Sequence, residues 1–293
     1  MPAAADYIDP VALMRVKSLE MRAKMVMEGF WRGIHRSPYH GFSVEFSEYR
    51  QYTKGDDPRF IDWKVMARTD RAYIKKFEDE TNLRAHLIVD RSKSMTYGSG
   101  EYSKSDYVAT FATTLGFFLM GQGDAVGLTT FDQKLDLHIP ARNRPGHLRR
   151  LMIELEKAPG GVGTDLAAGL RGINERVRKR SLLVMFSDFL APLEEVEREI
   201  GHLAAAGHDV TVVQCLDPAE REFTFDKAVH FEDAETGREL YVDPATAKKQ
   251  YLARLQTHLD GIRKACTKVG GNYHLFSTDY PLEMALAEFV QRR

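Results

Sequence analysis

Residues 85–94, AHLIVDRSKS, contain the most informative stretch of this chain. The apolar run Leu87 to Val89 predicts a buried β-strand, and it ends directly in a carboxylate followed by two spaced hydroxyls. Three hard oxygen donors, Asp90, Ser92 and Ser94, therefore stand at the carboxyl edge of the predicted strand. Such donors suit Mg²⁺, Mn²⁺ or Ca²⁺ and suit zinc or copper poorly. Taken alone, the loop is equally well explained as a capped strand-to-helix turn, because Asp and Ser favour such positions.

On the carboxyl side of this stretch, predicted strands and helices alternate. This pattern is typical of an α/β fold with a doubly wound, mostly parallel sheet. Residues 181–187 are strongly apolar, so we expect them to form a central strand. Strands are predicted over 83–90, 125–131, 181–187, 209–215 and 273–276, with 135–140 as an antiparallel edge strand and a hairpin over 223–242. Helices are predicted over 103–120, 145–157, 164–178, 193–206, 245–268 and 282–290.

The amino-terminal part has a different pattern. Residues 9–33 carry apolar side chains at helical spacing and predict a helix. Residues 35–80 are rich in Gly, Pro, aromatic and charged side chains without a sustained helical period, which indicates short strands and turns. We therefore expect two parts: an N-terminal helical and β-rich elaboration over 1–80, and an α/β domain over 81–293.

Composition excludes several classes of protein. The chain has 293 residues, of which 43% are apolar and 28% charged, as in ordinary globular proteins. A net charge of −1 gives no reason to expect nucleic acid or an anionic membrane as partner. Two cysteines make no disulfide framework, and no apolar run approaches the roughly 18 residues needed to span a bilayer. Because a signal peptide is also absent, we expect a soluble cytoplasmic protein.

Three polar loops should meet at one edge of the sheet. In doubly wound sheets ligands bind beyond the carboxyl ends of the strands, where residues 90–94, 163–165 and 187–188 are due to converge. Hydroxyl ligands fill coordination positions without neutralising a cation, so such a site could accept a carboxylate from a partner. The candidate metal ligands are Asp90, Ser92, Ser94, Thr164 and Asp188, and the expected cofactor is Mg²⁺ (or Mn²⁺ or Ca²⁺).

This set of residues resembles the metal-ion-dependent adhesion site of von Willebrand factor A domains. The resemblance covers residues 83–289 and rests on Asp-x-Ser-x-Ser, a Gly-preceded Thr, and Asp after an apolar strand. It implies that Ser92, Ser94 and Thr164 are hydroxyl ligands, and that Asp90 and Asp188 act directly or through bound water. One departure is Phe189, which stands where that family often has Gly and makes the loop bulkier.

The segment before the α/β part adds a second resemblance. Residues 49–64, YRQYTKGDDPRFIDWK, continuing to Ala67-Arg68-Thr69, resemble the hallmark of the bacterial domain-of-unknown-function 58 (DUF58) family. That family implies a partner of MoxR-type AAA+ ATPases with an adaptor or chaperone-like role, and no firmly assigned reaction. The interleaved charges of the hallmark fit either an ion-paired structural clasp or a docking or anion site built on Arg50, Arg59 and Arg68.

Two classes of function remain open. The first is a non-enzymatic protein-binding module that recruits a protein partner through a metal. The second is a metal-dependent hydrolase, phosphatase-like, using Asp90. The position two residues after Asp90 is Ser92 rather than a second acid, and no histidine or cysteine nucleophile–base set accompanies the loops. His86, His138 and His274 are expected in the core, at the surface or at an edge rather than as zinc ligands. We therefore expect binding, not catalysis.

Overall fold

The computed structural model describes residues 7–36, 49–51, 66, 73–75, 83–160, 166–225, 229–232, 239–242 and 244–291. The chain divides into two compact units. One comprises Met1–Gly33 with Leu83–Arg293, and the other comprises Ile34–Asn82. In the second unit, β1 (Tyr49–Gln51) pairs antiparallel with β2 (Tyr73–Lys75).

A six-stranded sheet forms the centre of the first unit, with strand order β10-β7-β6-β3-β4-β5. Every neighbouring pair is parallel except β4 and β5, which are antiparallel. The prediction of an α/β fold with a mostly parallel sheet and an antiparallel edge strand is therefore confirmed. The strands are β3 (Arg84–Asp90), β4 (Ala125–Phe131), β5 (Leu135–Arg142), β6 (Leu182–Ser187), β7 (Asp209–Leu216) and β10 (Asn272–Ser277).

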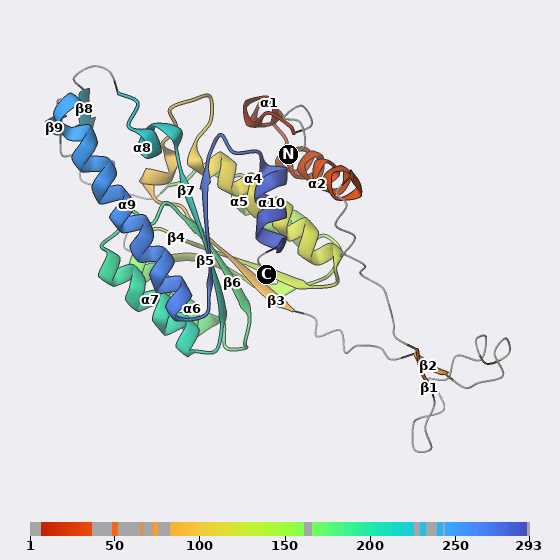
Figure 1. Cartoon of the computed structure of the whole chain (residues 1–293). Coiled ribbons are helices and arrows are strands. Elements are labelled where there is room, and N and C mark those ends of the chain that lie inside the picture. The colour runs from red at the N-terminus through yellow and green to blue at the C-terminus, as the bar shows by residue number, and fades with distance from the viewer. Residues whose placement is uncertain are drawn as a thin grey trace. The chain divides into compact units, whose positions relative to one another are not determined.

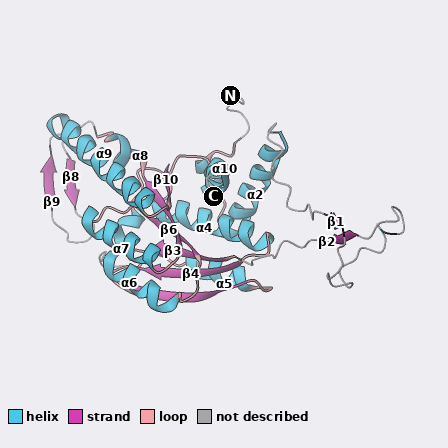
Figure 2. Ribbon diagram, turned by 60° about the horizontal axis from the view of Figure 1, so that its bottom comes forward, coloured by secondary structure: helices cyan, strands magenta, loops and turns pink. Residues whose placement is uncertain are grey.

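Helices cover both faces of this sheet (Figures 1 and 2). One face carries α6 (Leu166–Arg176), α7 (Leu193–Ala205) and α9 (Pro244–Lys268). The other carries α4 (Lys104–Gly121), α5 (His147–Leu155) and α10 (Leu282–Gln291). Because both faces are covered, all six residues of β6 are buried, as expected for a central parallel strand.

Apolar side chains fill the space on each side of the sheet. On the α6–α7–α9 side, strand residues such as Ile88 and Met185 share one cluster with Leu170 and Ile200. On the other side, the Phe111 ring of α4 meets the ring of Phe186 edge-on, with centroids 5.7 Å apart. These contacts fix the strands from both faces, and so they fix where the loops after β3 and β6 begin.

The N-terminal helical segment belongs to the same compact unit as the sheet. The single helix expected over 9–33 is two helices, α1 (Pro10–Met14) and α2 (Leu19–Arg36). Along α2, Leu19, Ala23, Val26 and Phe30 are buried, and the Phe30 ring packs against Phe118 of α4 at 5.7 Å. These helices therefore pack in the same compact unit as the sheet.

Shorter elements complete the first unit. The 3₁₀ turn η2 (Lys93–Thr96) follows β3, and α8 (Pro218–Glu222) follows β7. The expected hairpin is present as the antiparallel pair β8 (Val229–Glu232) and β9 (Glu239–Val242). In the part of the chain that the structure describes, no helix is both long enough and apolar enough to cross a membrane.

Candidate functional site

The site lies where the strand order reverses. In chain order β3 is the first strand of the sheet and β6 is the fourth, and the two are neighbours in the sheet. The strand that follows β3 in the chain, β4, lies on one side of this pair, and the strand that follows β6, β7, lies on the other side. Ligands of open α/β sheets bind at such a switch point, beyond the carboxyl ends of the strands. Asp90 ends β3 and Ser187 ends β6. The topology thus brings together two loops that are nearly a hundred residues apart in sequence.

Asp90 is held by hydrogen bonds from both loops. Its Oδ1 accepts from the backbone N–H of Ser92 at 2.8 Å, and its Oδ2 accepts from the Ser187 hydroxyl at 2.5 Å. The side chain is buried, with 1% of its surface exposed. Asp90 therefore fixes the first loop to the end of β6.

The two serines of the first loop converge next to this carboxylate. Ser92 is fully buried and Ser94 is half-buried. Their hydroxyl oxygens lie 3.1 Å apart. Ser94 also donates a hydrogen bond to the Asp188 carboxylate. Asp90, Ser92, Ser94 and Asp188, all named from the sequence, thus meet at the predicted edge.

Asp188 also meets a residue that the sequence did not point to. The ammonium Nζ of Lys104 lies 2.8 Å from Asp188 Oδ2 and 2.6 Å from Glu220 Oε1. No part of the Lys104 side chain is exposed. Lys104 is the first residue of α4, directly after the Ser103 cap. A cation at the first position of a helix interacts unfavourably with the helix dipole. This unusual placement was the one signal in the sequence that could have indicated Lys104.

The charges of the cluster shift several pKa values. Burial, together with the nearby charge of Asp188, raises the pKa of Asp90 above its usual range. Burial alone would also raise the pKa of Asp188, but the Lys104 ammonium holds it below the usual value. Burial alone would lower the pKa of Lys104, yet its two carboxylate partners raise it. Asp188 and Lys104 thus form a charged pair, while among the described residues no cation balances the carboxylate form of Asp90.

The donor set fits a hard divalent cation. Adjacent ligands of an octahedral Mg²⁺, each at 2.0–2.1 Å, are separated by about 2.9 Å, which is close to the 3.1 Å between the Ser92 and Ser94 hydroxyls. Among the described residues, no three His, Cys, Asp or Glu side chains gather as a metal-binding group. A cation at this edge would therefore depend on hydroxyl oxygens as well as carboxylates.

Phe189 does not obstruct the loop as its size suggested. Its backbone is in the left-handed region, with φ at 52°, and its side chain is 1% exposed within the apolar cluster beneath the loop. Leu190 is instead the outward residue, with 49% of its surface exposed. Its N–H donates to Asp188 Oδ1 at 3.3 Å. Glycine adopts such a left-handed turn without steric cost, whereas phenylalanine does not.

The structure does not describe every residue that the sequence predicted for the two candidate sites. Thr164, the third predicted hydroxyl ligand, is outside the described residues, as are Arg59 and Arg68 of the hallmark. Arg50 is the middle residue of β1. The structure therefore assembles four of the five predicted metal ligands and leaves both interpretations of the arginines as predictions.

His86, His274 and both cysteines lie in the core rather than at this site. His86 and His274 are buried, and His138 stacks on His86 with ring centroids 5.6 Å apart. Cys215 and Cys266 are free and buried. Burial raises the pKa of the Cys215 thiol, which keeps it protonated and unreactive.

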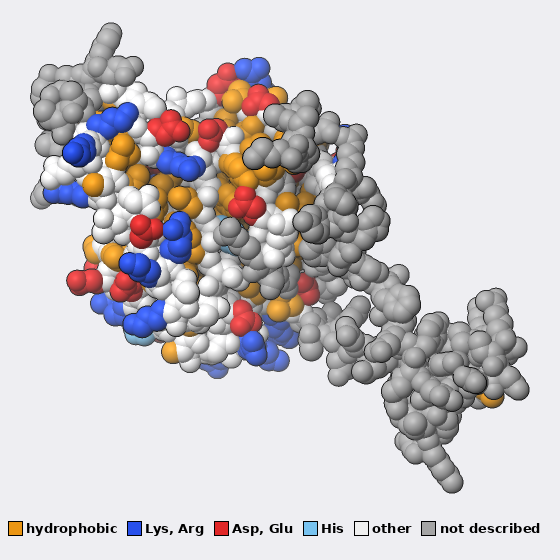
Figure 3. Space-filling view, viewed as in Figure 1, with side chains coloured by type: hydrophobic (Ala, Val, Ile, Leu, Met, Phe, Trp, Pro, Cys, Tyr) orange, Lys and Arg blue, Asp and Glu red, His pale blue; other side chains and the backbone are white. Residues whose placement is uncertain are grey.

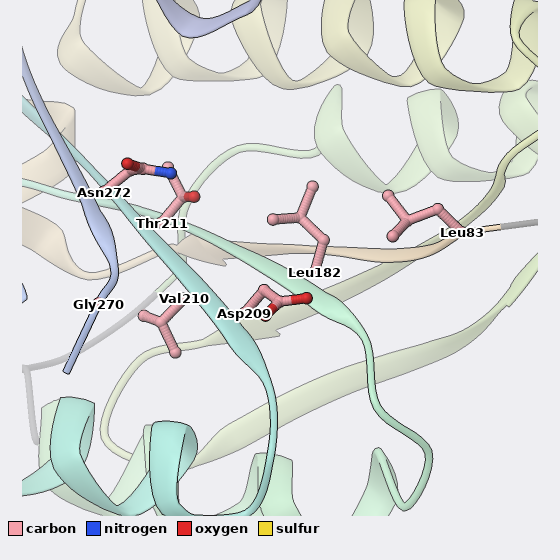
Figure 4. A pocket seen from close by; sticks show the side chains of 7 residues that line it. All are labelled: Leu83, Leu182, Asp209, Val210, Thr211, Gly270 and Asn272. Atoms are coloured by element: carbon pink, nitrogen blue, oxygen red, sulfur yellow. The ribbon is translucent and has the colours of Figure 1, made fainter. Parts of the chain in front are cut away.

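A pocket of about 290 Å³ lies at the opposite, amino edge of the sheet (Figure 4). Leu182, Asp209 and Asn272, which line it, stand at or near the starts of their strands. It is therefore separate from the cluster around Asp90.

Figure 3 shows acidic, basic and apolar side chains intermingled over one face of the molecule, without a large patch of one charge sign.

Several known proteins are similar to this chain. "Uncharacterized protein Rv1480" of Mycobacterium tuberculosis is 31% identical to this chain, over 98% of the chain and 92% of the relative. Among solved structures, the conserved hypothetical protein BatB from Bacteroides thetaiotaomicron is 14% identical, with a TM-score of 0.47, over 72% of this chain and 98% of that one. The SpRpn10 VWA domain is 11% identical, with a TM-score of 0.41, over 70% and 94% of the two chains.

The sequence pattern of one family, described as "Protein of unknown function DUF58", matches residues 48–260. The match begins just before the hallmark segment, includes β3 to β7 of the sheet and ends within α9, before β10. It covers more than half of the chain. This chain therefore belongs to the DUF58 family.

Proposed function

We propose that this chain is a non-enzymatic protein-binding module that recruits its partner through a divalent cation, Mg²⁺ or else Mn²⁺ or Ca²⁺, at the carboxyl edge of the sheet. Asp90, Ser92, Ser94, Thr164 and Asp188 would hold the cation. When bound, it would supply a Lewis-acidic position for a carboxylate oxygen of the partner. The observation that carries this proposal is the hydroxyl pair of Ser92 and Ser94 beside two buried carboxylates at the switch point.

The environment of Asp90 supports binding over phosphatase-like hydrolysis. A nucleophilic carboxylate must reach its substrate, but both oxygens of Asp90 accept hydrogen bonds and only 1% of the residue is exposed. Asp188 is tied to Lys104 and is poorly placed to act as a general base. Metal-dependent turnover of a generic phosphate ester, abolished by Asp90→Ala, would overturn this preference.

The surroundings of the cluster support a protein as the partner. Leu190, two residues after Asp188, is 49% exposed. Tyr97 is 37% exposed, and its ring centroid lies 5.8 Å from Lys104 Nζ. Exposed apolar and aromatic side chains around a buried polar centre are typical of protein interfaces. We therefore expect the partner to present an acidic residue flanked by apolar ones.

Membership of the DUF58 family makes a MoxR-type AAA+ ATPase the partner to test first. The test measures binding of a purified MoxR-type ATPase to the immobilised chain, in Mg²⁺ and then in a chelator. We expect binding in Mg²⁺, and loss of at least ten-fold in affinity with chelator or with Ser92→Ala/Ser94→Ala. Thr257→Ala, which removes an exposed hydroxyl on α9, is the matched control and should bind normally. Equal binding under all these conditions would refute recruitment through a metal.

The hallmark arginines allow a separate test of docking. If Arg50, Arg59 and Arg68 form a docking site, Arg59→Ala should weaken ATPase binding while the melting temperature stays unchanged. If they belong to a structural clasp, the same substitution should lower the melting temperature. Binding and calorimetric melting, measured on the same preparation, separate the two interpretations.

A further inference from the structure

Lys104 is the most unusual charged residue in the described part of the molecule. Its side chain is completely buried at the first position of α4, where a cation is unfavourable for the helix dipole. Burying an ammonium costs free energy unless it is paired and hydrogen-bonded. Asp188 and Glu220 supply that pairing, at 2.8 and 2.6 Å. The contact joins the metal site to α8, which no motif in the sequence indicated.

The position of Lys104 places it in competition with a metal. Asp188 Oδ2, the oxygen that accepts from Lys104, belongs to the same carboxylate that Ser94 contacts. A divalent cation next to Ser92 and Ser94 would be attracted by Asp188 and repelled by the Lys104 ammonium. We propose that Lys104 is a built-in counter-cation that lowers the affinity of the site for a divalent cation by occupying Asp188. This inference rests on the proposed metal site.

Glu220 gives Lys104 a second anchor. The Glu220 side chain also accepts from the Asp217 N–H at 2.8 Å, in a capping box that starts α8. Asp217 in turn accepts from the Ser99 N–H and hydroxyl, at 2.9 and 2.6 Å. Lys104 can therefore remain paired with Glu220 when Asp188 becomes a ligand of a divalent cation. The network keeps Asp188 paired and the site folded when no divalent cation is bound. It makes the site bind a cation more weakly until an additional ligand, such as the partner's carboxylate, is present.

The test is the affinity for Mn²⁺, which can be followed by electron paramagnetic resonance without any partner. Lys104→Met/Glu220→Gln removes the ammonium together with one carboxylate, so the summed charge of the cluster is unchanged. We expect this variant to bind Mn²⁺ at least ten-fold more tightly than the unaltered chain. Glu220→Gln alone should bind no more tightly, because Lys104 then relies on Asp188 only.

Two further variants control for charge and folding. Lys24→Met/Glu20→Gln removes an exposed ion pair of α2, joined at 2.6 Å, and should change the affinity less than two-fold. Lys104→Gln keeps a hydrogen-bond donor without the charge, and should also tighten binding. Circular dichroism and melting confirm that each variant is folded. If neither Lys104 variant folds even in excess Mn²⁺, the inference is wrong, because the cation should replace the lost charge.

The outcomes separate this inference from the proposed function. Tight Mn²⁺ binding by the unaltered chain that does not change in a folded Lys104→Met/Glu220→Gln variant contradicts the role of Lys104 and leaves the metal site standing. Binding that appears only after Lys104 is replaced supports the inference and contradicts a metal-dependent function of the natural chain. Absence of Mn²⁺ binding in every folded variant contradicts both.

Discussion

At the scale of single residues, Phe189 occupies a backbone conformation that most side chains avoid. Its φ of 52° is in the left-handed region, which costs a non-glycine residue roughly 1–2 kcal/mol. The side chain compensates by packing into the core below the loop, where it is 1% exposed. The sequence identified the departure from glycine, but it could not show that the ring turns inward, because that depends on how the core packs between β6 and its helices.

This balance predicts an unusual order of stability. Phe189→Ala should lower the free energy of unfolding by about 3–5 kcal/mol, since it removes a buried ring and keeps the backbone strain. Phe189→Gly removes the same ring but relieves the strain, so it should cost about 1 kcal/mol less than the alanine variant. Urea denaturation in the presence of chelator measures both. A glycine variant less stable than the alanine variant would contradict the strained-turn interpretation.

His86 is a second residue whose burial has a measurable consequence. Burial, with the neighbouring His138, His208 and Arg84, lowers the pKa of His86 to about 4. A histidine buried in its neutral form contributes stability that is complete above its unfolded pKa of 6.5 and is lost as the pH falls from 6.5 to 4. No hydrogen-bond partner of its Nδ1 is found among the described residues.

We therefore predict that His86→Leu flattens the acid limb of the stability profile. Between pH 6.5 and 4 the unaltered chain should lose about 3 kcal/mol through His86, at 1.36 kcal/mol per pKa unit, and the variant should not lose this part. Chemical denaturation across this pH range gives the comparison. Parallel profiles for the two proteins would show that His86 titrates normally.

At the scale of elements, the sequence predicted the strands and most helices of the sheet domain because their periods are strong. It missed α8, since five residues carry too little pattern, although Asp217-Pro218 with Glu220 is a recognisable helix start. It merged α1 and α2, because their apolar residues form neighbouring stripes on one helical wheel. Both errors concern short or interrupted helices, for which tertiary contacts decide the ends.

The start of α4 is the element that positions Lys104. The Ser103 hydroxyl accepts from the Asp106 N–H at 3.2 Å, and the Asp106 carboxylate accepts from the Ser103 N–H at 2.9 Å. Ser103→Ala should therefore lower the free energy of unfolding by about 1 kcal/mol, and Ser103→Thr should lower it by much less because the hydroxyl remains. Thermal melting of both variants checks this; an alanine variant as stable as the unaltered chain would argue against the cap.

At the scale of the whole molecule, topology explains what the sequence could and could not predict about the site. The order of the motifs along the chain located Asp90, Ser92, Ser94 and Asp188, because parallel strands bring their carboxyl ends to one edge. Lys104 and Glu220 were not predicted. Their contact spans 116 positions, and its one signal in the sequence is a cation at the first position of a helix. The family and the α/β sheet can thus be predicted from the sequence. The pairing of Lys104 with Asp188 and Glu220 cannot.

The proposed function requires that hydroxyls and carboxylates at this edge hold a divalent cation. A calorimetric titration of the whole chain with Mn²⁺, beside Ser92→Ala/Ser94→Ala and the control Thr257→Ala, tests it most directly. We predict one saturable site in the unaltered chain and in the control, and at least a ten-fold loss of affinity in the double serine variant. No saturable binding by the unaltered chain, or equal binding by all three folded proteins, would contradict the claim.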